Sequence, residues 1–343
     1  MDAFGRVPRY AAPMQAAIVG IAGPNLLPDE AALFRAHPPA GVILFARNIR
    51  DPAQLGALVA SLRRVLPTHA VLMVDQEGGR VARLRPPHWR AHPPAATLGR
   101  CFAANRAAGL RAAFLTGALI GLDCAAVGFD VAAAPVLDLG LRGASNVVGD
   151  RAFAADPTIV ARLGRAMAAG LLAAGTQPVG KHAPGHGRAL VDSHLALPRV
   201  HASDLRADLL PFGLNTDLPW LMTAHIVYAA WDPILPATVS RAVIGGIIRG
   251  RLGFGGIIVS DDLAMQALSG TPTQRAMAAL AAGCDVALYC AGDPEPTADL
   301  LAACPALTPD AEARLRAARA LAASRRRPLD AAALAAERDR LLA

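Results

Sequence analysis

Residues 178–194 read PVGKHAPGHGRALVDSH, a short apolar run that passes directly into a loop carrying three of the chain's nine histidines. The first part, Pro178–His182, has the length and apolar character of a buried parallel strand and ends in two polar residues. Lys181 is the only lysine in 343 residues. Because a compact ammonium and a planar guanidinium are not interchangeable, one lysine in an arginine-rich chain indicates a site that requires it.

Seven further apolar runs of similar length occur along the chain, with helix-like segments between them. This alternation is typical of parallel strands joined by crossover helices, and eight repeats favour a closed barrel over an open sheet. The sequence therefore predicts an α/β fold formed by a single (β/α)8 TIM-type barrel. The predicted strands are Gln15–Ala22, Gly41–Phe45, Val71–Asp75, Val131–Asp138, Pro178–His182, Leu221–His225, Gly256–Asp261 and Asp285–Cys290.

The helix-like segments carry start signals. Ser203 and Ser240 are predicted N-caps, and Pro52, Pro157 and Pro272 are predicted to lie in first turns, where proline is tolerated. The predicted helices are Pro52–Leu66, Ala103–Val127, Pro157–Ala174, Ser203–Asn215, Ser240–Leu252 and Pro272–Ala282.

The length of the chain suits two average domains or one large barrel. Residues 296–343 are rich in Ala, Leu and Arg and have helical periodicity without a strand pattern, so we expect them to form helices that pack on the barrel. We therefore expect one catalytic domain over residues 1–343. The proline-rich segment Pro86–Pro94 is expected to form a rigid loop over the barrel rim.

The composition narrows the function classes. The net charge is +7, but aromatic residues are only 4% and no basic run is interleaved with them, so a nucleic-acid partner is not predicted. Five scattered cysteines without C-x-x-C spacing indicate a reduced compartment. The N-terminal segment MDAFGRVPRYAAP has no apolar core of signal-peptide length, and we find no apolar run of about 18 residues. We expect a cytoplasmic protein without membrane insertion.

Polar groups stand at the ends of seven of the eight predicted strands. In a barrel of this kind the carboxyl ends of the strands form the catalytic mouth, so these side chains are expected to converge there. They are Arg47 with Asn48, Asp75, Asp138, Lys181 with His182, His225, Asp261 and Cys290.

Two carboxylates and a histidine suggest acid–base or covalent catalysis. Asp261, at the end of a buried strand, can attack a carbon centre or hold a metal, whereas Asp262 is expected to point away or to cap the next helix. Asp192 stands two residues before His194, so its carboxylate can hydrogen-bond one ring nitrogen and favour the protonated imidazole. His194 is therefore a candidate general acid that can act as a base in a later step. His186, between two glycines, is expected to stabilise the turn.

Other polar residues can bind a hydroxyl-rich ligand. Arg83 follows Asp75 by eight residues and Arg151 follows a loop, so both can reach over the mouth. His225 is expected to lie in the core or to support the site. The candidate binding residues are Asp75, Arg83, Arg151, Lys181 and His182.

Several motifs, in their order along the chain, resemble the family 3 glycoside hydrolases. The similarity spans roughly residues 15–295 and is greatest to the short bacterial branch, the β-N-acetylhexosaminidases that recycle peptidoglycan. The motifs are LFARN (Leu44–Asn48), VDQEGGRVARL (Val74–Leu84), APVLDLG (Ala134–Gly140), GDRAFAADP (Gly149–Pro157), KHAPGHG (Lys181–Gly187), DSH (Asp192–His194), SDDLAM (Ser260–Met265) and AGCDV (Ala282–Val286).

By this resemblance, Asp261 would be the nucleophile that forms a covalent glycosyl-enzyme, and His194, paired with Asp192, would be the acid/base. The five candidate binding residues match the family's sugar-binding positions. The implied reaction is retaining hydrolysis of terminal, non-reducing β-linked N-acetylglucosamine from peptidoglycan-derived anhydro-muropeptides, with no metal or organic cofactor. The resemblance leaves three points open: how strictly the aglycone is selected, whether phosphate can replace water as the acceptor, and whether the chain is a monomer or a weak dimer.

One position departs from the family pattern. Family members commonly have Phe where this chain has Ala183, inside KHAPGHG. Loss of that ring removes apolar packing under the loop, so we expect an effect on loop mobility or on rate, while the reacting groups remain.

Three other functions fit parts of the sequence. A metal-dependent barrel hydrolase could use the histidines with Asp261, although the first strand lacks the His-x-His that such enzymes usually carry. A Schiff-base lyase could use Lys181. A non-catalytic sugar-binding barrel could keep the pocket, but Asp261 and His194 are both present.

Overall fold

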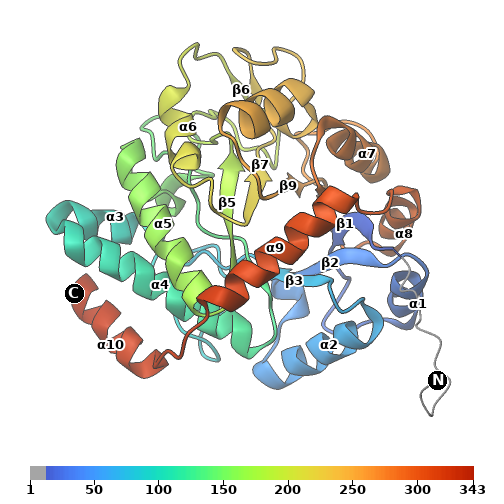
Figure 1. The fold of residues 1–343 in the computed structure, drawn as a ribbon, viewed down its shortest axis with the longest axis horizontal. Helices are drawn as coiled ribbons and strands as arrows, with labels where there is room; N and C mark the ends of the chain where they lie inside the picture. Colours follow the sequence, from blue (N-terminus) through green and yellow to red (C-terminus); the bar gives the residue numbers. More distant parts are fainter. Residues whose placement is uncertain (1–12) are drawn as a thin grey trace.

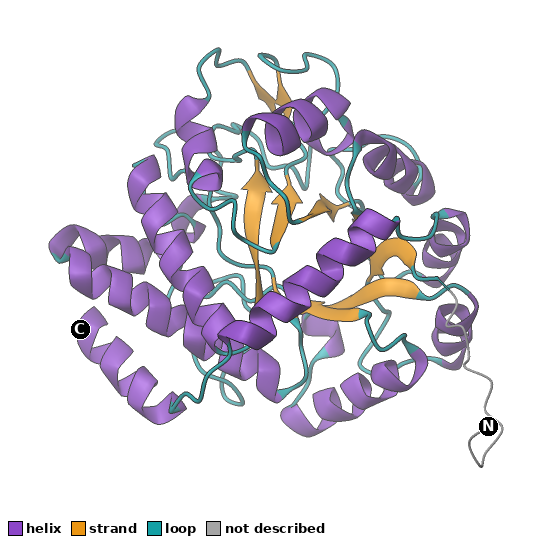
Figure 2. Cartoon of the chain, viewed as in Figure 1, coloured by secondary structure: helices purple, strands orange, loops and turns teal. Residues whose placement is uncertain are grey.

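The structure, a computed structural model, describes residues 13–343. The prediction that the N-terminal segment is not a signal peptide concerns mainly residues 1–12, which lie outside the described residues. Eight parallel strands close into a barrel in the order β1-β10-β9-β7-β5-β4-β3-β2 (Figures 1 and 2), which confirms the predicted fold class. The barrel strands are β1 (Gln15–Val19), β2 (Pro39–Leu44), β3 (Val71–Val74), β4 (Val131–Ala132), β5 (Gln177–Ala183), β7 (Trp220–Thr223), β9 (Ile257–Asp262) and β10 (Val286–Tyr289).

Successive apolar residues of the strands alternate between two apolar cores. In β2, Ile43 belongs to the core inside the barrel, whereas Val42 and Leu44 belong to the layer between the strands and the helices. Burial on both faces explains why the strands read as continuous apolar runs rather than as alternating patterns. The one indole inside the barrel, that of Trp220, donates its N–H to Gln177 Oε1 at 2.9 Å.

Helices surround the barrel. The three prolines predicted in first turns, Pro52, Pro157 and Pro272, each open a helix behind a residue whose side chain accepts a hydrogen bond from the first turn. The helices are α1 (Pro28–Ala36), α2 (Pro52–Val65), α3 (Ala95–Ala104), α4 (Arg106–Ala126), α5 (Pro157–Ala173), α6 (Arg206–Gly213), α7 (Pro272–Ala282), α8 (Pro294–Ala303), α9 (Pro309–Arg325) and α10 (Ala331–Leu342), with 3-10 turns η1 (Ala46–Asn48), η2 (Gly149–Arg151) and η3 (Ala237–Val239) and a π-helix, η4 (Ala242–Arg251).

Some local predictions were wrong. The helix predicted over Ala103–Val127 is interrupted at Asn105, whose side chain caps α4 by accepting from two backbone N–H groups. Ser203 is not an N-cap, because α6 begins only after Leu205. The strand predicted over Val131–Asp138 forms regular pairing for two residues and then only an isolated bridge between Val136 and Lys181.

The structure also contains a two-stranded parallel sheet that was not predicted. It pairs β6 (Arg199–Val200) with β8 (Val227–Tyr228), and each strand has only two residues, which is too short to give a sequence pattern.

The segment after Cys290 forms the helices α8, α9 and α10. Helix α9 lies across the amino-terminal end of the barrel (Figure 1), and Ala311, Leu315 and Ala318 belong to the core inside the barrel. This helix therefore closes the barrel on the side away from the strand ends that carry the polar residues.

Helix α4 is long and apolar enough to cross a membrane by length and composition, contrary to the expectation that no segment reaches this length. However, 67% of its apolar window is buried inside the structure, where α4 packs against α3, α5 and α10. Such burial is typical of a core helix. All five cysteines are free.

Candidate active site

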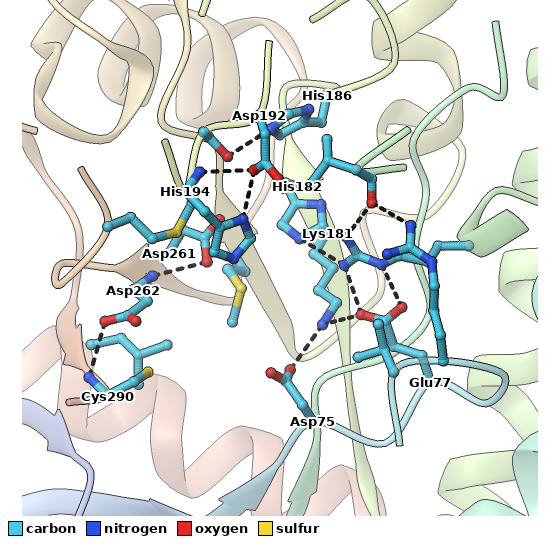
Figure 3. Close-up of a pocket in the computed structure, with 18 of the residues that line it drawn as sticks. Asp75, Glu77, Lys181, His182, His186, Asp192, His194, Asp261, Asp262 and Cys290 are labelled. Atoms are coloured by element: carbon cyan, nitrogen blue, oxygen red, sulfur yellow. Dashed lines mark hydrogen bonds and ion pairs between the residues drawn. The ribbon is translucent and has the colours of Figure 1, made fainter. Parts of the chain in front are cut away.

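A cavity of about 530 Å³ opens at the carboxyl ends of the barrel strands (Figure 3). Its lining contains all eight residues that the sequence proposes for the site, brought together from β5, β9 and the loops that follow β3, β4 and β5. They are Asp75, Arg83, Arg151, Lys181, His182, Asp192, His194 and Asp261. Of the other polar strand ends, Cys290 also lines the cavity, while Arg47, Asn48, Asp138 and His225 lie behind it.

A compact group of charges occupies one side of the cavity. Lys181 Nζ lies 3.0 Å from Asp75 Oδ1 and 2.6 Å from Glu77 Oε1. Arg151 donates two hydrogen bonds of 2.8 Å to the Glu77 carboxylate, and Arg83 donates one of 3.2 Å to Asp75. Glu77 was not predicted, although it stands two residues after Asp75 in the same motif, where a second carboxylate on that turn is the signal for it.

These charges fix one another's protonation states. Burial acts to raise the pKa of Glu77, but Arg151 and Lys181 outweigh it and bring the pKa down to about 2. Burial likewise acts to lower the pKa of Lys181, yet Asp75 and Glu77 raise it above its ordinary value. Lys181 is therefore a charged hydrogen-bond donor. This state argues against the Schiff-base alternative, which needs a neutral amine.

Arg80 also lines the cavity and was not predicted. Its Nε donates to Asp150 Oδ1 at 2.9 Å, and its Nη2 donates to the carbonyl oxygens of Asn146 and Val147, each at 2.8 Å. The Val147 carbonyl also accepts from Arg151 at 3.0 Å. Arg80 thereby fixes the loop that carries Arg151.

Asp138 orients the ring of His182. The carboxylate is fully buried and lies 2.6 Å from His182 Nδ1, while His182 Nε2 lies 3.3 Å from Arg151 Nη2. Because arginine can only donate, Nε2 is the acceptor and Nδ1 carries the proton that Asp138 accepts. Burial acts to raise the pKa of Asp138, but the adjacent His182 and the hydrogen bond from the His186 backbone N–H bring it to about 2.

Asp261 lies at the end of β9, the seventh barrel strand, and is partly exposed to the cavity. Its Oδ1 accepts from the Asp262 backbone N–H at 2.8 Å. Burial acts to raise the pKa of Asp261, but His182, His225 and that N–H hold it below its ordinary value. The carboxylate is therefore negatively charged at neutral pH.

Asp262 differs from its neighbour. Its carboxylate accepts from the backbone N–H groups of Ala264 and Cys290, at 2.9 and 3.0 Å. Of the two alternatives expected for Asp262, to point away or to cap the next helix, the capping role is wrong, because α7 begins ten residues later and is capped by Thr271. Asp262 instead stabilises the turn that leaves β9.

Asp192 and His194 stand at the mouth of the cavity. His194 Nδ1 lies 2.7 Å from Asp192 Oδ1, which also accepts from the His194 backbone N–H at 2.9 Å. Burial acts to raise the pKa of Asp192, but the hydrogen bonds from His194 lower it. The His194 side chain is 60% exposed, so water reaches the imidazole.

The loop carrying this pair is anchored at several points. The Tyr228 hydroxyl donates to the Gly185 carbonyl at 2.7 Å, and Arg188 pairs with the buried Asp208 at 2.7 Å. His186 Nε2 lies 3.0 Å from Ser193 Oγ. Burial lowers the pKa of His186 to about 4, so the ring is neutral. Its contact with Ser193 within the same loop agrees with the expected role of stabilising the turn.

Two further residues lie behind the cavity. Ala183 is fully buried in β5 and belongs to the core between the barrel and the helices, so the family's ring would occupy that packing layer rather than the cavity. His225 is also fully buried, with Nδ1 2.7 Å from Thr238 Oγ1 and Nε2 2.9 Å from the Asp262 carbonyl. Within residues 13–343, no group of three or more His, Cys, Asp or Glu side chains is arranged to hold a metal ion.

Comparisons with known proteins agree with this geometry. Residues 20–321 match the family model described as the glycosyl hydrolase family 3 N-terminal domain. A β-hexosaminidase of Aromatoleum aromaticum is 40% identical over 321 residues, which cover 91% of this chain and 89% of that relative. A β-hexosaminidase of Bordetella avium is 41% identical over 306 residues, which cover 87% of this chain and 86% of that relative. The crystal structure of NagZ from Neisseria gonorrhoeae with N-trifluoroacetyl-D-glucosamine superposes with a TM-score of 0.85 at 30% identity, covering 96% of this chain and 97% of that one. The chain therefore belongs to glycoside hydrolase family 3.

Proposed function

We propose that the chain is a retaining β-N-acetylhexosaminidase that releases terminal, non-reducing N-acetylglucosamine from peptidoglycan fragments in the cytoplasm. Membership of family 3 makes it a glycosidase, and the relatives named above are β-hexosaminidases. The observation that carries the proposal is one cavity that holds both a negatively charged Asp261 and, at its mouth, the Asp192–His194 pair.

In the first step, the Asp261 carboxylate attacks the anomeric carbon of the bound sugar. The bond from that carbon to the leaving oxygen breaks, and the leaving oxygen takes a proton from His194. Asp192 accepts a hydrogen bond from Nδ1 and so leaves Nε2 as the proton donor. The result is a glycosyl ester on Asp261 and a neutral imidazole.

In the second step, His194 Nε2 takes a proton from a water molecule as that water attacks the anomeric carbon. The ester bond to Asp261 breaks, and the carboxylate is regenerated together with the protonated imidazole. Two inversions at one carbon give overall retention of configuration. The exposure of His194 suits this role, because the same ring must meet both the leaving group and water.

The charged group on the other side of the cavity is proposed to hold the sugar. Asp75 and Glu77 offer acceptors to sugar hydroxyls, whereas Lys181, Arg83 and Arg151 offer donors. These side chains already pair with one another, so their directions are set before the sugar binds. A polar site of this kind binds a hydroxyl-rich ring without reorganisation.

The test is turnover of an aryl β-N-acetylglucosaminide by the wild type and by Asp261→Ala. We expect a loss of roughly three or more powers of ten in kcat, since the variant lacks the nucleophile. Asp262→Ala is the matched control, because it removes the adjacent carboxylate without removing the proposed nucleophile. Similar rates for the wild type and Asp261→Ala would refute the assignment, as would a slow fluorinated sugar that labels a residue other than Asp261.

The peptidoglycan origin of the substrate has its own test. Peptide stems carry carboxylates, which suits a chain with a net charge of +7. We expect a higher kcat/KM on anhydro-muropeptides than on the matching disaccharide without peptide, with a difference that shrinks as salt is added. Equal values at low salt would contradict the part of the proposal that concerns acidic stems.

A further inference from the structure

The turn after the sugar-binding carboxylates packs on residues 92–94, which do not line the cavity. Gly78 and Gly79 both have positive φ, and the Gly79 N–H donates to the His92 carbonyl at 2.9 Å. A Cβ on Gly78 would lie 2.4 Å from the Pro93 carbonyl oxygen, and one on Gly79 would lie 2.7 Å from Pro94 Cβ. The position of this turn therefore depends on the position of the backbone of residues 92–94. The same holds for Glu77, which directly precedes the turn.

The side chain of His92 is fully buried and fixed at both ring nitrogens. Nε2 lies 2.9 Å from Asp123 Oδ2 on α4, and Nδ1 lies 3.2 Å from Arg338 Nη1 on α10. Arg90 pairs with the other oxygen of Asp123. Because arginine only donates, Nδ1 must accept and Nε2 must carry the proton. Burial lowers the pKa of His92, and the charges of Arg338 and Arg90 lower it further, although Asp123 acts to raise it. The ring therefore stays in this neutral form at pH 7.

Arg338 makes this contact from the last helix of the chain. Helix α10 lies beside α3 and α4 (Figure 1), and Arg338 is its one buried residue, with 6% exposure. The rest of the helix is held by contacts that do not involve His92. Glu337 pairs with Arg111 through two hydrogen bonds of 2.7 and 2.6 Å, and the Leu341 carbonyl accepts from Cys101 Sγ at 3.3 Å.

We infer that Arg338 is a positioning residue for the sugar site: through the His92 ring it fixes residues 92–94, and through them the Gly78–Gly79 turn and the Glu77 carboxylate. The inference deepens the proposed function and rests on it, because it assigns to α10 a part in substrate affinity. Glu77 in turn orients Lys181 and Arg151. Loss of Arg338 would therefore loosen groups that bind the sugar, without touching Asp261 or His194.

The test compares Arg338→Ala with Glu337→Ala, on the same helix, at a temperature well below both unfolding midpoints. For Arg338→Ala we expect KM for an aryl β-N-acetylglucosaminide to rise about fivefold or more with kcat changed less than about twofold, which is the pattern for loss of uniform binding. Glu337→Ala weakens the docking of α10 but leaves His92 alone, so KM is expected to stay within about twofold of the wild type. Arg338→Lys keeps a donor and is expected to recover much of the affinity.

A second pair of variants covers the case in which Arg338→Ala does not fold. His92→Asn keeps an acceptor near the position of Nδ1, facing Arg338, whereas His92→Gln keeps a donor near the position of Nε2, facing Asp123. We expect the higher KM in His92→Gln. An unchanged KM in Arg338→Ala, an equal rise in Glu337→Ala, or equal KM values for the two His92 variants would overturn the inference. An inactive wild type would instead refute the proposed function, so the two failures are distinguishable.

Discussion

Replacement of Glu77 by glutamine removes one negative charge from the cavity while keeping the shape of the side chain. The carboxylate accepts two hydrogen bonds from Arg151 and pairs with Lys181, and its side chain is only 6% exposed. An amide has one acceptor oxygen and an NH2 group, so at least one cation would face a donor instead of an acceptor. The variant therefore leaves positive charge uncompensated in a region with little access to water.

The magnitude follows from the pKa of Glu77. Its fall from the ordinary 4.5 to about 2 corresponds to about 3 kcal/mol in favour of the charged form. With about 2.1 cal/mol/K of unfolding entropy per residue, a chain of 343 residues should lose about 4 °C in Tm. We also expect a rise of about tenfold in KM, or about 1.4 kcal/mol, because Lys181 and Arg151 lose their common partner.

The pH dependence has a definite sign. A carboxyl with a depressed native pKa stabilises the fold above its unfolded pKa of 4.5, and this stability is lost as the pH falls toward 2. The stability difference between the wild type and Glu77→Gln should therefore shrink from about 3 kcal/mol at pH 7 to about 2 kcal/mol at pH 3.5. Other titrating carboxylates largely cancel in this difference.

The measurement is urea unfolding of both proteins at the two pH values, with KM measured at pH 7. Glu312→Gln is the matched control, because its carboxylate makes an exposed pair with Arg316 at 3.5 Å, and it should change stability by less than about 0.5 kcal/mol. A Glu77→Gln variant as stable as the wild type at pH 7, or a difference that grows as the pH falls, would refute this reasoning.

Two further substitutions test other contacts of the site. Asp138→Asn should lower kcat/KM about tenfold or more and reduce Tm. The reason is that an amide cannot replace both of the carboxylate oxygens that accept hydrogen bonds from His182 and from the backbone of His186. A variant with the kcat/KM of the wild type would contradict this role. Gly78→Ala should destabilise the fold by about 1–3 kcal/mol in urea unfolding and raise KM, because φ is +105° and Cβ would lie 2.4 Å from a carbonyl oxygen. Gly143→Ala is the control, because Gly143 has φ +80° but no atom lies within 4 Å of the position of its Cβ, so this variant has the backbone strain without the clash. An equal loss of stability in the two alanine variants would show that the clash has no effect.

The barrel and much of its cavity could be predicted from the sequence, because both depend on local patterns. Strands buried on both faces must be continuous apolar runs, and the polar residue that ends each run lies at the mouth once the strands are parallel. Asp75, Lys181 and Asp261 could be located in this way, since the position of each follows from its own strand. The Asp192–His194 contact was also accessible, since it spans only two residues.

Contacts between distant segments were decided only by the tertiary structure. Nothing near Glu77 in the sequence indicates that Arg151 and Lys181 both pair with it, and nothing near Asp138 indicates that its carboxylate lies against His182. The same holds for Arg338, which reaches His92 across 246 positions of the chain. Residue type and periodicity determine which side chains leave a strand at the mouth, because these are properties of a single segment. The distances between charges depend on how the segments close around one core, and those distances set which carboxylates stay ionised and which rings are held.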